Sequence, residues 1–381
     1  MPRGRTRDLR AKGDPTIELD LFSPPARIAE EGEGISVDEL RMATRNHGMP
    51  LEMLDHGVTP LGLHYVLVHY DIPSLDSAAW RLEIGGHVER PLVLDLAALA
   101  ERPARTERVT MECAGNGRAW LAPRPVSQPW LDEAVGTARW TGTPLAPLLA
   151  EAGVRDGAVD VVFTGADHGI ERGVEQDYER ALPLAEAGHP DVLVVHTMNG
   201  QPLPPQHGAP VRLVVPGWYG MAHVKWLVKI TVLDAPFTGY QNTSTYRIKQ
   251  DVDEAGEPVT RMRPRALLRP PGFPDFQTRA RFVDRGVHEI VGRAWSGYGP
   301  VTRVEVSADA GATWTDAALG PDEDRYGWRR WSWTWTAATA GVHELCVRAT
   351  DAAGHTQPVE QRWNRQAMAN NHVQRVTVVV R

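Results

Sequence analysis

Short apolar–polar alternations separated by turn residues make up most of the first two thirds of the chain. Residues 80–85 alternate with the period of a half-buried strand, and 159–164 and 192–196 are short apolar runs typical of buried strands. A helical pattern covers 94–101 and Ser36 to Arg45, and the second of these begins with a capping box made by Ser36 and Glu39. Because strands and helices are mixed here, the pattern predicts an α+β fold.

The last hundred residues contain apolar alternations at regular intervals. The expected strands are 289–295, 301–308, 328–336, 341–350 and 373–380, joined by Gly- and Asp-containing turns. This spacing predicts an immunoglobulin-like β-sandwich. Trp331, Trp333 and Trp335 recur every second residue in the tryptophan-rich segment 328–335, so we expect most of its rings to lie in the core rather than at an interface.

A proline- and arginine-rich segment separates the two patterns and indicates a domain boundary. We therefore expect four parts, listed in chain order: a flexible N-terminal segment at 1–30, a mixed α+β domain at 31–257, an extended connector at 258–274 and the sandwich at 275–381.

Composition and charge exclude several classes of protein. The 381 residues include 35 Gly and 30 Pro, which favours strands and turns over helices, and the net charge of −7 provides no global positive field for nucleic acid. No apolar run approaches the roughly 18 residues that span a bilayer. The basic start of the chain lacks the apolar segment of a secretory signal. We expect a cytoplasmic protein, or a periplasmic one if an export signal has been removed.

The two cysteines lie in different contexts. Cys346 sits within an expected sandwich strand, where it is typical of a small core residue. Cys113 follows a strand-like segment and precedes a Gly-rich turn that contains Arg118, an environment that favours a thiolate. A structural cysteine, a metal ligand and a nucleophile are all compatible with this pattern. Zinc-protease, Cys-x-x-Cys, nucleophile-elbow, phosphate-loop and dinucleotide motifs are not found.

The sequence Cys-Ala-Gly-Asn-x-Arg at 113–118 resembles the signature of the sulfite oxidase family of molybdenum enzymes. Further blocks that resemble the family occur in its order, so the resemblance covers about residues 45–381. These blocks are Arg45-Asn46-His47, 137–140, 199–212, 214–217, 223–226, 294–297 and 303–314.

The resemblance implies a molybdenum ion held by the dithiolene of a pterin cofactor, with Cys113 as the protein ligand. Arg, Lys and His donors suit the phosphate of such a cofactor, and a carboxylate can accept from the pterin N–H groups. The residues implied to bind the cofactor are Arg45, Asn46, His47, Asp167, His207, Arg212, His223, Val224 and Lys225.

The resemblance also implies a substrate site formed by Arg45, Arg118, Trp130 and Tyr178. Sulfite oxidases have an arginine at the position of Gly117. They have a third anion-binding arginine at the last position of the motif Trp-Ser-Gly-x-Gly-x, which is Pro300 in this sequence. An arginine of the connector, namely Arg261, Arg263 or Arg265, is a candidate to replace the missing charge.

The leading hypothesis is the oxidation of sulfite to sulfate, with electrons passed to a separate acceptor such as a cytochrome. Two alternatives stay open: an enzyme of the same family that acts on sulfane sulfur, a sulfoxide or nitrate, and a protein that binds the cofactor without turnover. The resemblance further implies a homodimer formed through the C-terminal domain.

Overall fold

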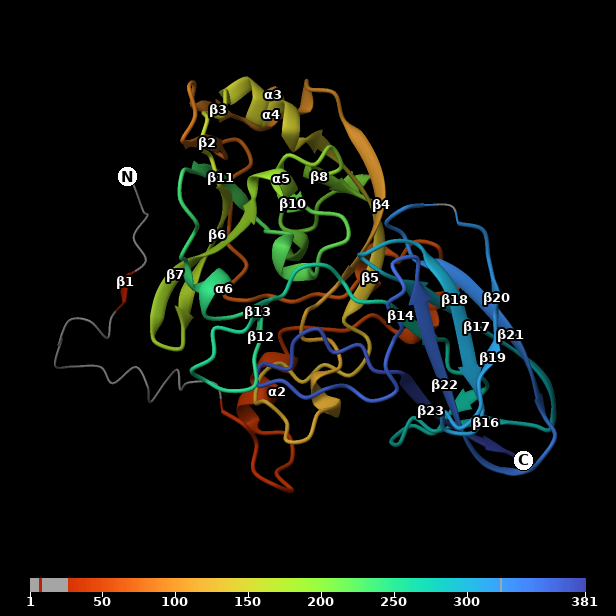
Figure 1. The fold of residues 1–381 in the computed structure, drawn as a ribbon. Coiled ribbons are helices and arrows are strands. Elements are labelled where there is room, and N and C mark those ends of the chain that lie inside the picture. Colours follow the sequence, from red (N-terminus) through yellow and green to blue (C-terminus); the bar gives the residue numbers. More distant parts are fainter. Residues whose placement is uncertain (1–6, 9–26, 323) are drawn as a thin grey trace.

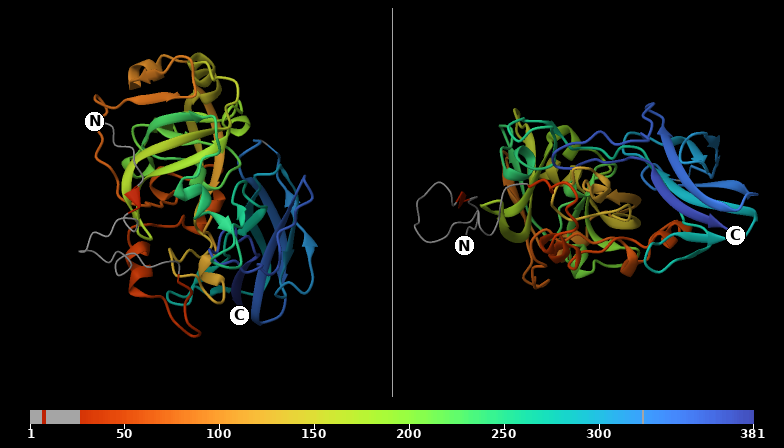
Figure 2. Two further views of the ribbon diagram at one scale, coloured as in Figure 1. Left: turned by 60° about the vertical axis from the view of Figure 1, so that its left-hand side comes forward. Right: turned by 90° about the horizontal axis from the view of Figure 1, so that it is seen from below.

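The structure is a computed structural model that describes residues 7–8, 27–322 and 324–381. The predicted flexible segment 1–30 lies mostly outside these residues. Two parts lie side by side, a mixed part that contains short helices and a β-rich part that ends at the C-terminus (Figures 1 and 2). Among the described residues, no helix is both long and apolar enough to cross a bilayer.

The first part contains a six-stranded sheet in which β11 and β2 are parallel and the other neighbours are antiparallel. Its strands, in spatial order, are β1 (Arg7–Asp8), β7 (Val174–Pro183), β6 (Asp160–Glu171), β11 (Leu227–Leu233), β2 (Leu82–Gly86) and β3 (Leu92–Leu94). Ile84, Phe163 and Ile230 from three of these strands are fully buried in the core beneath the sheet.

A second, antiparallel sheet of this part carries the residues that lead to Cys113. Its strands are β10 (Arg212–Val214), β8 (Leu193–Met198), β5 (Val135–Pro144) and β4 (Arg105–Glu112), and β9 (Gln201–Pro202) pairs with β8. Because β4 ends at Glu112, the expected Gly-rich turn begins directly at the cysteine.

Short helices connect these strands, as the sequence predicts. Helix α2 begins after Ser36, whose hydroxyl accepts from Glu39 N while the Glu39 carboxylate accepts from Ser36 N, so the predicted capping box is confirmed. The helices are α2 (Val37–Ala43), α3 (Leu96–Ala100), α4 (Leu145–Ala152), α5 (Leu184–Ala187) and α6 (Tyr240–Thr243). The 3₁₀ turns are η2 (Leu51–Asp55), η3 (Leu61–Leu63), η4 (Arg118–Trp120), η5 (Pro205–His207) and η6 (Gly220–Ala222), and a small ladder joins β12 (Arg247–Ile248) to β13 (Glu257–Pro258).

The second part is a two-sheet β-sandwich. One sheet has the order β14 (Arg265–Leu268), β17 (Gly286–Trp295), β21 (Arg329–Ala337) and β20 (Ala318–Leu319). The other has the order β15 (Phe273–Pro274), β16 (Arg281–Val283), β23 (Gln374–Val380), β22 (Gly341–Asp351), β18 (Val301–Ser307) and β19 (Thr315–Asp316). Trp331 and Trp335 lie in the sandwich core with Trp333 packed against it, whereas Trp328 packs in the core of the first part, so the prediction is confirmed for most of these rings. Cys346 is fully buried as predicted, and the immunoglobulin-like topology stays a prediction.

Two segments fasten the sandwich to the first part. Residues 265–268 of the predicted connector form β14, and Arg265 on this strand reaches Glu112 and Asp132 of the first part. The second segment, residues 358–372 between β22 and β23, is here called the strap. It crosses to the Cys113 turn, where Ala369 N donates to Ala114 O at 2.7 Å and Asn370 Nδ2 donates to Gly117 O at 2.7 Å.

Candidate active site

Two chambers meet at Cys113. The inner chamber lies within the first part, and the outer one, here called the vestibule, has a volume of about 230 Å³ and is closed on one side by the strap. Among the described residues, those that line both chambers are Leu67, His69, Cys113 and Tyr246.

Cys113 is held where β4 gives way to the turn. Its backbone N–H donates to Ala134 O at 2.9 Å, and its side chain is almost fully buried. Burial raises the pKa of the thiol, and the Arg118 guanidinium, the Gly115 N–H and the Trp130 indole N–H oppose that rise. A bound metal ion would complete this environment, because the ligand form of cysteine is the thiolate.

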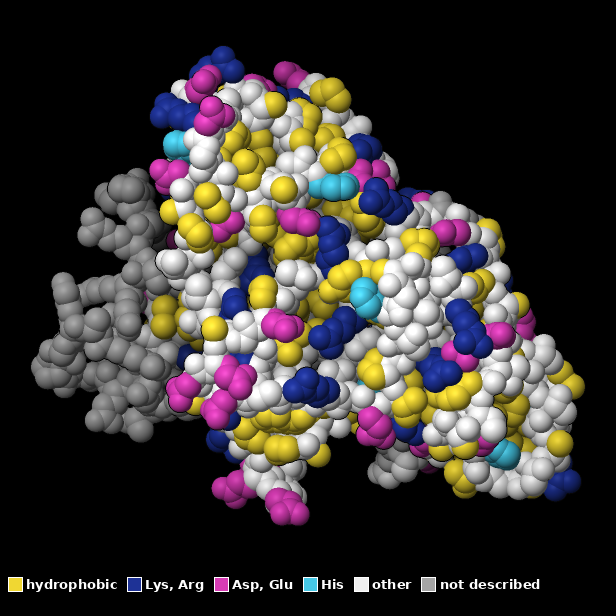
Figure 3. Space-filling model, in the orientation of Figure 1, with side chains coloured by type: hydrophobic (Ala, Val, Ile, Leu, Met, Phe, Trp, Pro, Cys, Tyr) yellow, Lys and Arg dark blue, Asp and Glu magenta, His cyan; other side chains and the backbone are white. Residues whose placement is uncertain are grey.

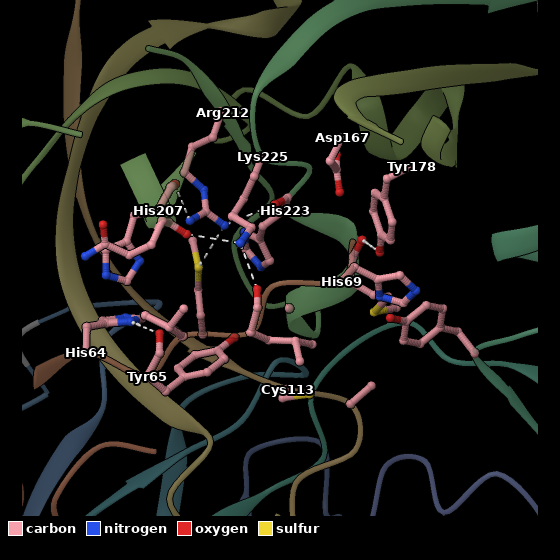
Figure 4. Close-up of a pocket in the computed structure, with 18 residues that line it drawn as sticks. His64, Tyr65, His69, Cys113, Asp167, Tyr178, His207, Arg212, His223 and Lys225 are labelled. Atoms are coloured by element: carbon pink, nitrogen blue, oxygen red, sulfur yellow. Dashed lines mark hydrogen bonds between the residues drawn. The ribbon is translucent and has the colours of Figure 1, made fainter. Parts of the chain in front are cut away.

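Four basic residues gather in the inner chamber above Cys113, namely His207, Arg212, His223 and Lys225 (Figure 4). Arg212 donates to His207 O at 2.9 Å and to His223 O at 3.0 Å, and its guanidinium lies 4.9 Å from the ring centre of Trp140. Lys225 Nζ donates to Leu67 O at 2.7 Å and to Gln206 O at 3.0 Å. The structure therefore brings together four of the residues that the sequence singled out.

Burial has a clear electrostatic effect on the titratable groups of this chamber. It lowers the pKa of His207 to about 2 and that of His223 to about 3, and neighbouring cations contribute to both shifts. It also lowers the pKa of Lys225 and raises that of the nearby Asp167 carboxyl. An anionic ligand would stabilise the protonated forms of these bases, so the chamber suits a phosphate group.

Several buried polar atoms of the inner chamber lack a hydrogen-bond partner among the described residues. They include His207 Nε2, His64 Nε2 and Asp167 Oδ1. Because buried polar atoms are almost always hydrogen-bonded, these atoms mark the positions of ligand groups. A cofactor with a phosphate for the bases and N–H donors for the carboxylate fits this set.

The side chains of the predicted triplet Arg45-Asn46-His47 do not line the inner chamber, so their role in cofactor binding stays a prediction. Arg45 is half exposed and pairs with Asp71 at 2.7 Å, and His47 is also exposed. The reason is that the backbone of His47 pairs with that of Val66, so the triplet lies one layer behind the segment 64–69 that lines the chamber. Asn46 reaches only the vestibule, where its Nδ2 donates to Gln128 Oε1 at 3.0 Å.

Two other predicted positions differ in detail. The side chain of Val224 lines neither chamber, although its carbonyl accepts from Leu213 N at 2.8 Å. Tyr178 lines the inner chamber, where its hydroxyl donates to Met221 O at 2.9 Å. Tyr246 instead lines both chambers beside Cys113, and sequence reasoning missed it because no motif surrounds it.

The vestibule contains the other two predicted substrate residues. Arg118 is buried and donates to Gln128 O at 3.0 Å and to Gln366 O at 3.4 Å, while its Nε atom has no partner among the described residues. The indole N–H of Trp130, also buried, faces the Cys113 thiol and has no other acceptor among the described residues. Both groups are therefore available to an anion that enters beside Cys113.

The candidate replacements for a missing arginine line neither chamber, which corrects the expectation that one of them reaches the anion site. Arg261 pairs with Glu186 at 2.7 Å, Arg263 donates to the strap at Ala369 O, and Arg265 is buried between two carboxylates. Arg172 from the β6–β7 turn and Arg365 from the strap line the vestibule instead. Positive charge is thus local, and Lys and Arg side chains gather across the middle of the face shown in Figure 3, between the two parts.

The structure also explains the two departures from the sulfite oxidase pattern. Gly117 has φ +82°, and a Cβ atom there would lie 2.8 Å from Asn370 Nδ2, so the strap leaves no room for a side chain. Pro300 lines a separate cavity together with Trp218 and Arg261. Its identity therefore has no direct bearing on the vestibule.

The site combines a buried thiol, a basic chamber with unpartnered polar atoms and an adjoining cationic vestibule. This combination is typical of a protein that binds a phosphate-bearing metal cofactor next to an anion site. Comparisons with known proteins agree with this class. The family model for the oxidoreductase molybdopterin binding domain matches residues 69–241, and that for the Mo-co oxidoreductase dimerisation domain matches residues 275–381.

Similar proteins include an NADH nitrate reductase of Brassica napus, 32% identical over 84% of this chain and 38% of its own length. The mitochondrial sulfite oxidase of Mus musculus is 33% identical over 87% of this chain and 63% of its own length. The chain thus spans less than two thirds of these relatives. The crystal structure of the sulfane dehydrogenase SoxCD from Paracoccus pantotrophus superimposes with a TM-score of 0.77 at 26% identity, covering 99% of this chain and 95% of that chain.

The chain belongs to the sulfite oxidase family of molybdopterin-dependent oxidoreductases. The molybdopterin cofactor fits the unpartnered atoms of the inner chamber, and Cys113 is its expected metal ligand.

Proposed function

We propose that this protein oxidises a sulfur oxyanion, with sulfite as its simplest substrate, to the next higher oxyanion at the Cys113 site. The observation that carries the proposal is the buried Arg118 beside Cys113, with a guanidinium Nε that has no partner among the described residues. A desolvated guanidinium at the opening of a cofactor chamber binds an anion strongly.

The bound cofactor would supply the two-electron redox chemistry and the transfer of an oxygen atom. Arg118 would orient the anion by donating hydrogen bonds to its oxygens, and Trp130 would add an indole N–H. Burial raises the pKa of the Tyr246 hydroxyl well above its ordinary value, so this group stays protonated and donates to the same oxygens. In the net reaction, sulfite and water give sulfate, two protons and two electrons.

A second candidate substrate class has support from the junction of the two chambers. Leu67 lines both chambers, and none of the described residues shared by them is an arginine or a lysine. A junction without an arginine or lysine also suits the singly charged nitrate ion or sulfane sulfur, which the names of the similar nitrate reductases and of the sulfane dehydrogenase mention.

The partners are also part of the proposal. Electrons from the reaction would leave to a separate one-electron acceptor such as a cytochrome. The match of residues 275–381 to a dimerisation domain supports a homodimer formed through the sandwich.

The test is sulfite-dependent reduction of ferricyanide by protein of measured molybdenum content, with Cys113→Ser as the metal-ligand control. We expect turnover by the wild-type protein and none by the variant. A fully loaded sample that ignores sulfite but reduces nitrate with a viologen donor would replace the sulfite hypothesis with the nitrate one.

A further inference from the structure

The junction at Cys113 is apolar on one side and cationic on the other. Leu67 packs against the cluster of buried side chains that contains Tyr65, Cys113 and Trp130. Arg118 faces the same thiol from the vestibule. An anion bound here would therefore meet positive charge along one side and an aliphatic surface along the other.

The vestibule is much larger than an inorganic oxyanion needs. Its volume is about 230 Å³, whereas a water molecule needs only about 10–15 Å³ of such space. Much of its wall is apolar, and the side chains that form this surface are Met42, Pro125, Val126, Ile170 and Met368. Ligand sites enclose most of the surface of the molecule that they bind, so this wall favours a substrate with an organic substituent.

Arg27, Arg172 and Arg365 join Arg118 in the lining of the vestibule, and of these Arg365 lies on the strap. Arg365 lines the cavity, and its buried Nε atom has no hydrogen-bond partner among the described residues. Its backbone N–H donates to Lys249 O at 2.8 Å, which fixes this part of the strap to the first part of the protein. A guanidinium with an unpartnered N–H suits a carboxylate or another anionic group.

Arg118 and Arg365 are linked through the strap. Gln366, the residue next to Arg365, accepts from Arg118 through its carbonyl. Its side-chain amide donates to Ser244 O at 2.8 Å and accepts from Arg247 N at 3.1 Å. Because this residue is held on three sides, the spacing of Arg118 and Arg365 is set by the fold rather than by a mobile loop.

We propose that the preferred substrate is an organic sulfinate whose substituent carries a second anionic group. Its sulfinate would bind at Arg118 beside Cys113, its carbon chain along Leu67 and the thioether of Met368, and its second anion at Arg365. This inference rests on the proposed function, because a sulfinate is sulfite with one oxygen replaced by carbon.

The reaction balances in the same way as sulfite oxidation. The sulfinate and water give the sulfonate, two protons and two electrons. One sulfur–oxygen bond forms, both O–H bonds of water break, and the carbon–sulfur bond is kept. The sulfur is oxidised, and the electrons leave to the one-electron acceptor already proposed, which is represented by ferricyanide in the assay.

The experiment compares four substrates on holoenzyme of known molybdenum content: sulfite, methanesulfinate, 2-aminoethanesulfinate and 3-sulfinopropionate. We expect kcat/KM for 3-sulfinopropionate to exceed that for methanesulfinate by about tenfold or more, the range of a charge-assisted hydrogen bond. The 2-aminoethanesulfinate, whose tail is cationic, should be the poorest sulfinate.

Arg365→Gln should reduce the preference for 3-sulfinopropionate over methanesulfinate by about tenfold. Arg362→Gln is the matched control, because Arg362 lies on the same strap but is exposed and outside the vestibule. A binding measurement accompanies the kinetics: calorimetric titration with 3-sulfopropanoate, the sulfonate product, should show the same loss of affinity in Arg365→Gln and none in Arg362→Gln.

The outcomes separate this inference from the proposed function. Turnover of sulfite with no turnover of any sulfinate would overturn the inference and leave the function standing. Equal rates for the anionic and cationic tails, or equal effects of the two arginine variants, would also overturn it. A loaded enzyme that oxidises neither sulfite nor sulfinates would overturn both proposals, and turnover of 3-sulfinopropionate that depends on Arg365 would uphold the inference.

Discussion

Replacing Arg265 by leucine should destabilise the protein strongly, because this arginine joins the sandwich to the Cys113 turn. Its side chain is fully buried, and it donates to Glu112 at 3.0 Å, to Asp132 at 2.5 Å and to Asn370 O on the strap at 2.8 Å. Glu112 is itself fully buried. Leucine would fill much of the volume and leave two carboxylates without their cation.

The magnitude follows from that loss. Removing one partner of a buried ion pair costs about 3–5 kcal/mol, because the remaining charge is desolvated and uncompensated. For domains of this size, each kcal/mol lowers the melting temperature by about 2–4 °C. We therefore expect Arg265→Leu to melt about 6–20 °C below the wild-type protein at pH 7.

Differential scanning calorimetry measures this effect, and a combined variant tests its cause. In Arg265→Leu with Glu112→Gln and Asp132→Asn, no buried charge is left without a partner, so more than half of the lost stability should return. A melting temperature for Arg265→Leu within about 2 °C of the wild type would refute the reasoning. So would a combined variant that is less stable than Arg265→Leu alone.

Three further predictions follow from the site. Cys113→Ser should lose its molybdenum, measured by elemental analysis, because a hydroxyl is a poor ligand for a soft site, whereas Cys346→Ser in the sandwich core should keep it. Gly117→Ala should lower the melting temperature more than Gly157→Ala, because both glycines have positive φ but only Gly117 faces the strap at close range. Burial would raise the pKa of Glu171, but His69 together with Gln241 and Arg172 outweighs this and lowers it from 4.5 to about 2. The lowered pKa contributes about 3 kcal/mol of stability above pH 4.5 while His69 is protonated, and this contribution is lost as the pH falls toward 2. Glu171→Gln should therefore remove this acid-side loss from urea unfolding midpoints.

Local patterns in the sequence were sufficient for much of the fold. The capping box at Ser36 depends on residues three positions apart, and the alternation around Cys346 and Trp331 depends on the two-residue period of a strand. Each of these features is decided within one element. They were therefore predicted correctly without knowledge of what the element packs against.

The placement of site residues depends instead on contacts between distant segments. The triplet at 45–47 has the residue types of a cofactor site, yet the bridge between His47 and Val66 puts it behind the lining segment. Arg261 is likewise drawn to Glu186, which is 75 residues away in sequence. A cation pairs with the carboxylate that is nearest in space, and the spacing of residues within one segment does not predict which carboxylate that is.

The strap shows why the two parts of the chain have to be considered together. Residues 275–381 match a dimerisation domain, yet within that range Arg365, Gln366 and Met368 line the vestibule. Gly117 has no room for a side chain because Asn370 of the strap occupies the space beside it. The residue that replaces a family arginine and the residues that bring new groups to the vestibule are thus parts of one packing arrangement. A change of substrate in this chain would therefore require linked changes at the Cys113 turn and in the strap, and neither sequence segment alone determines the shape of the site.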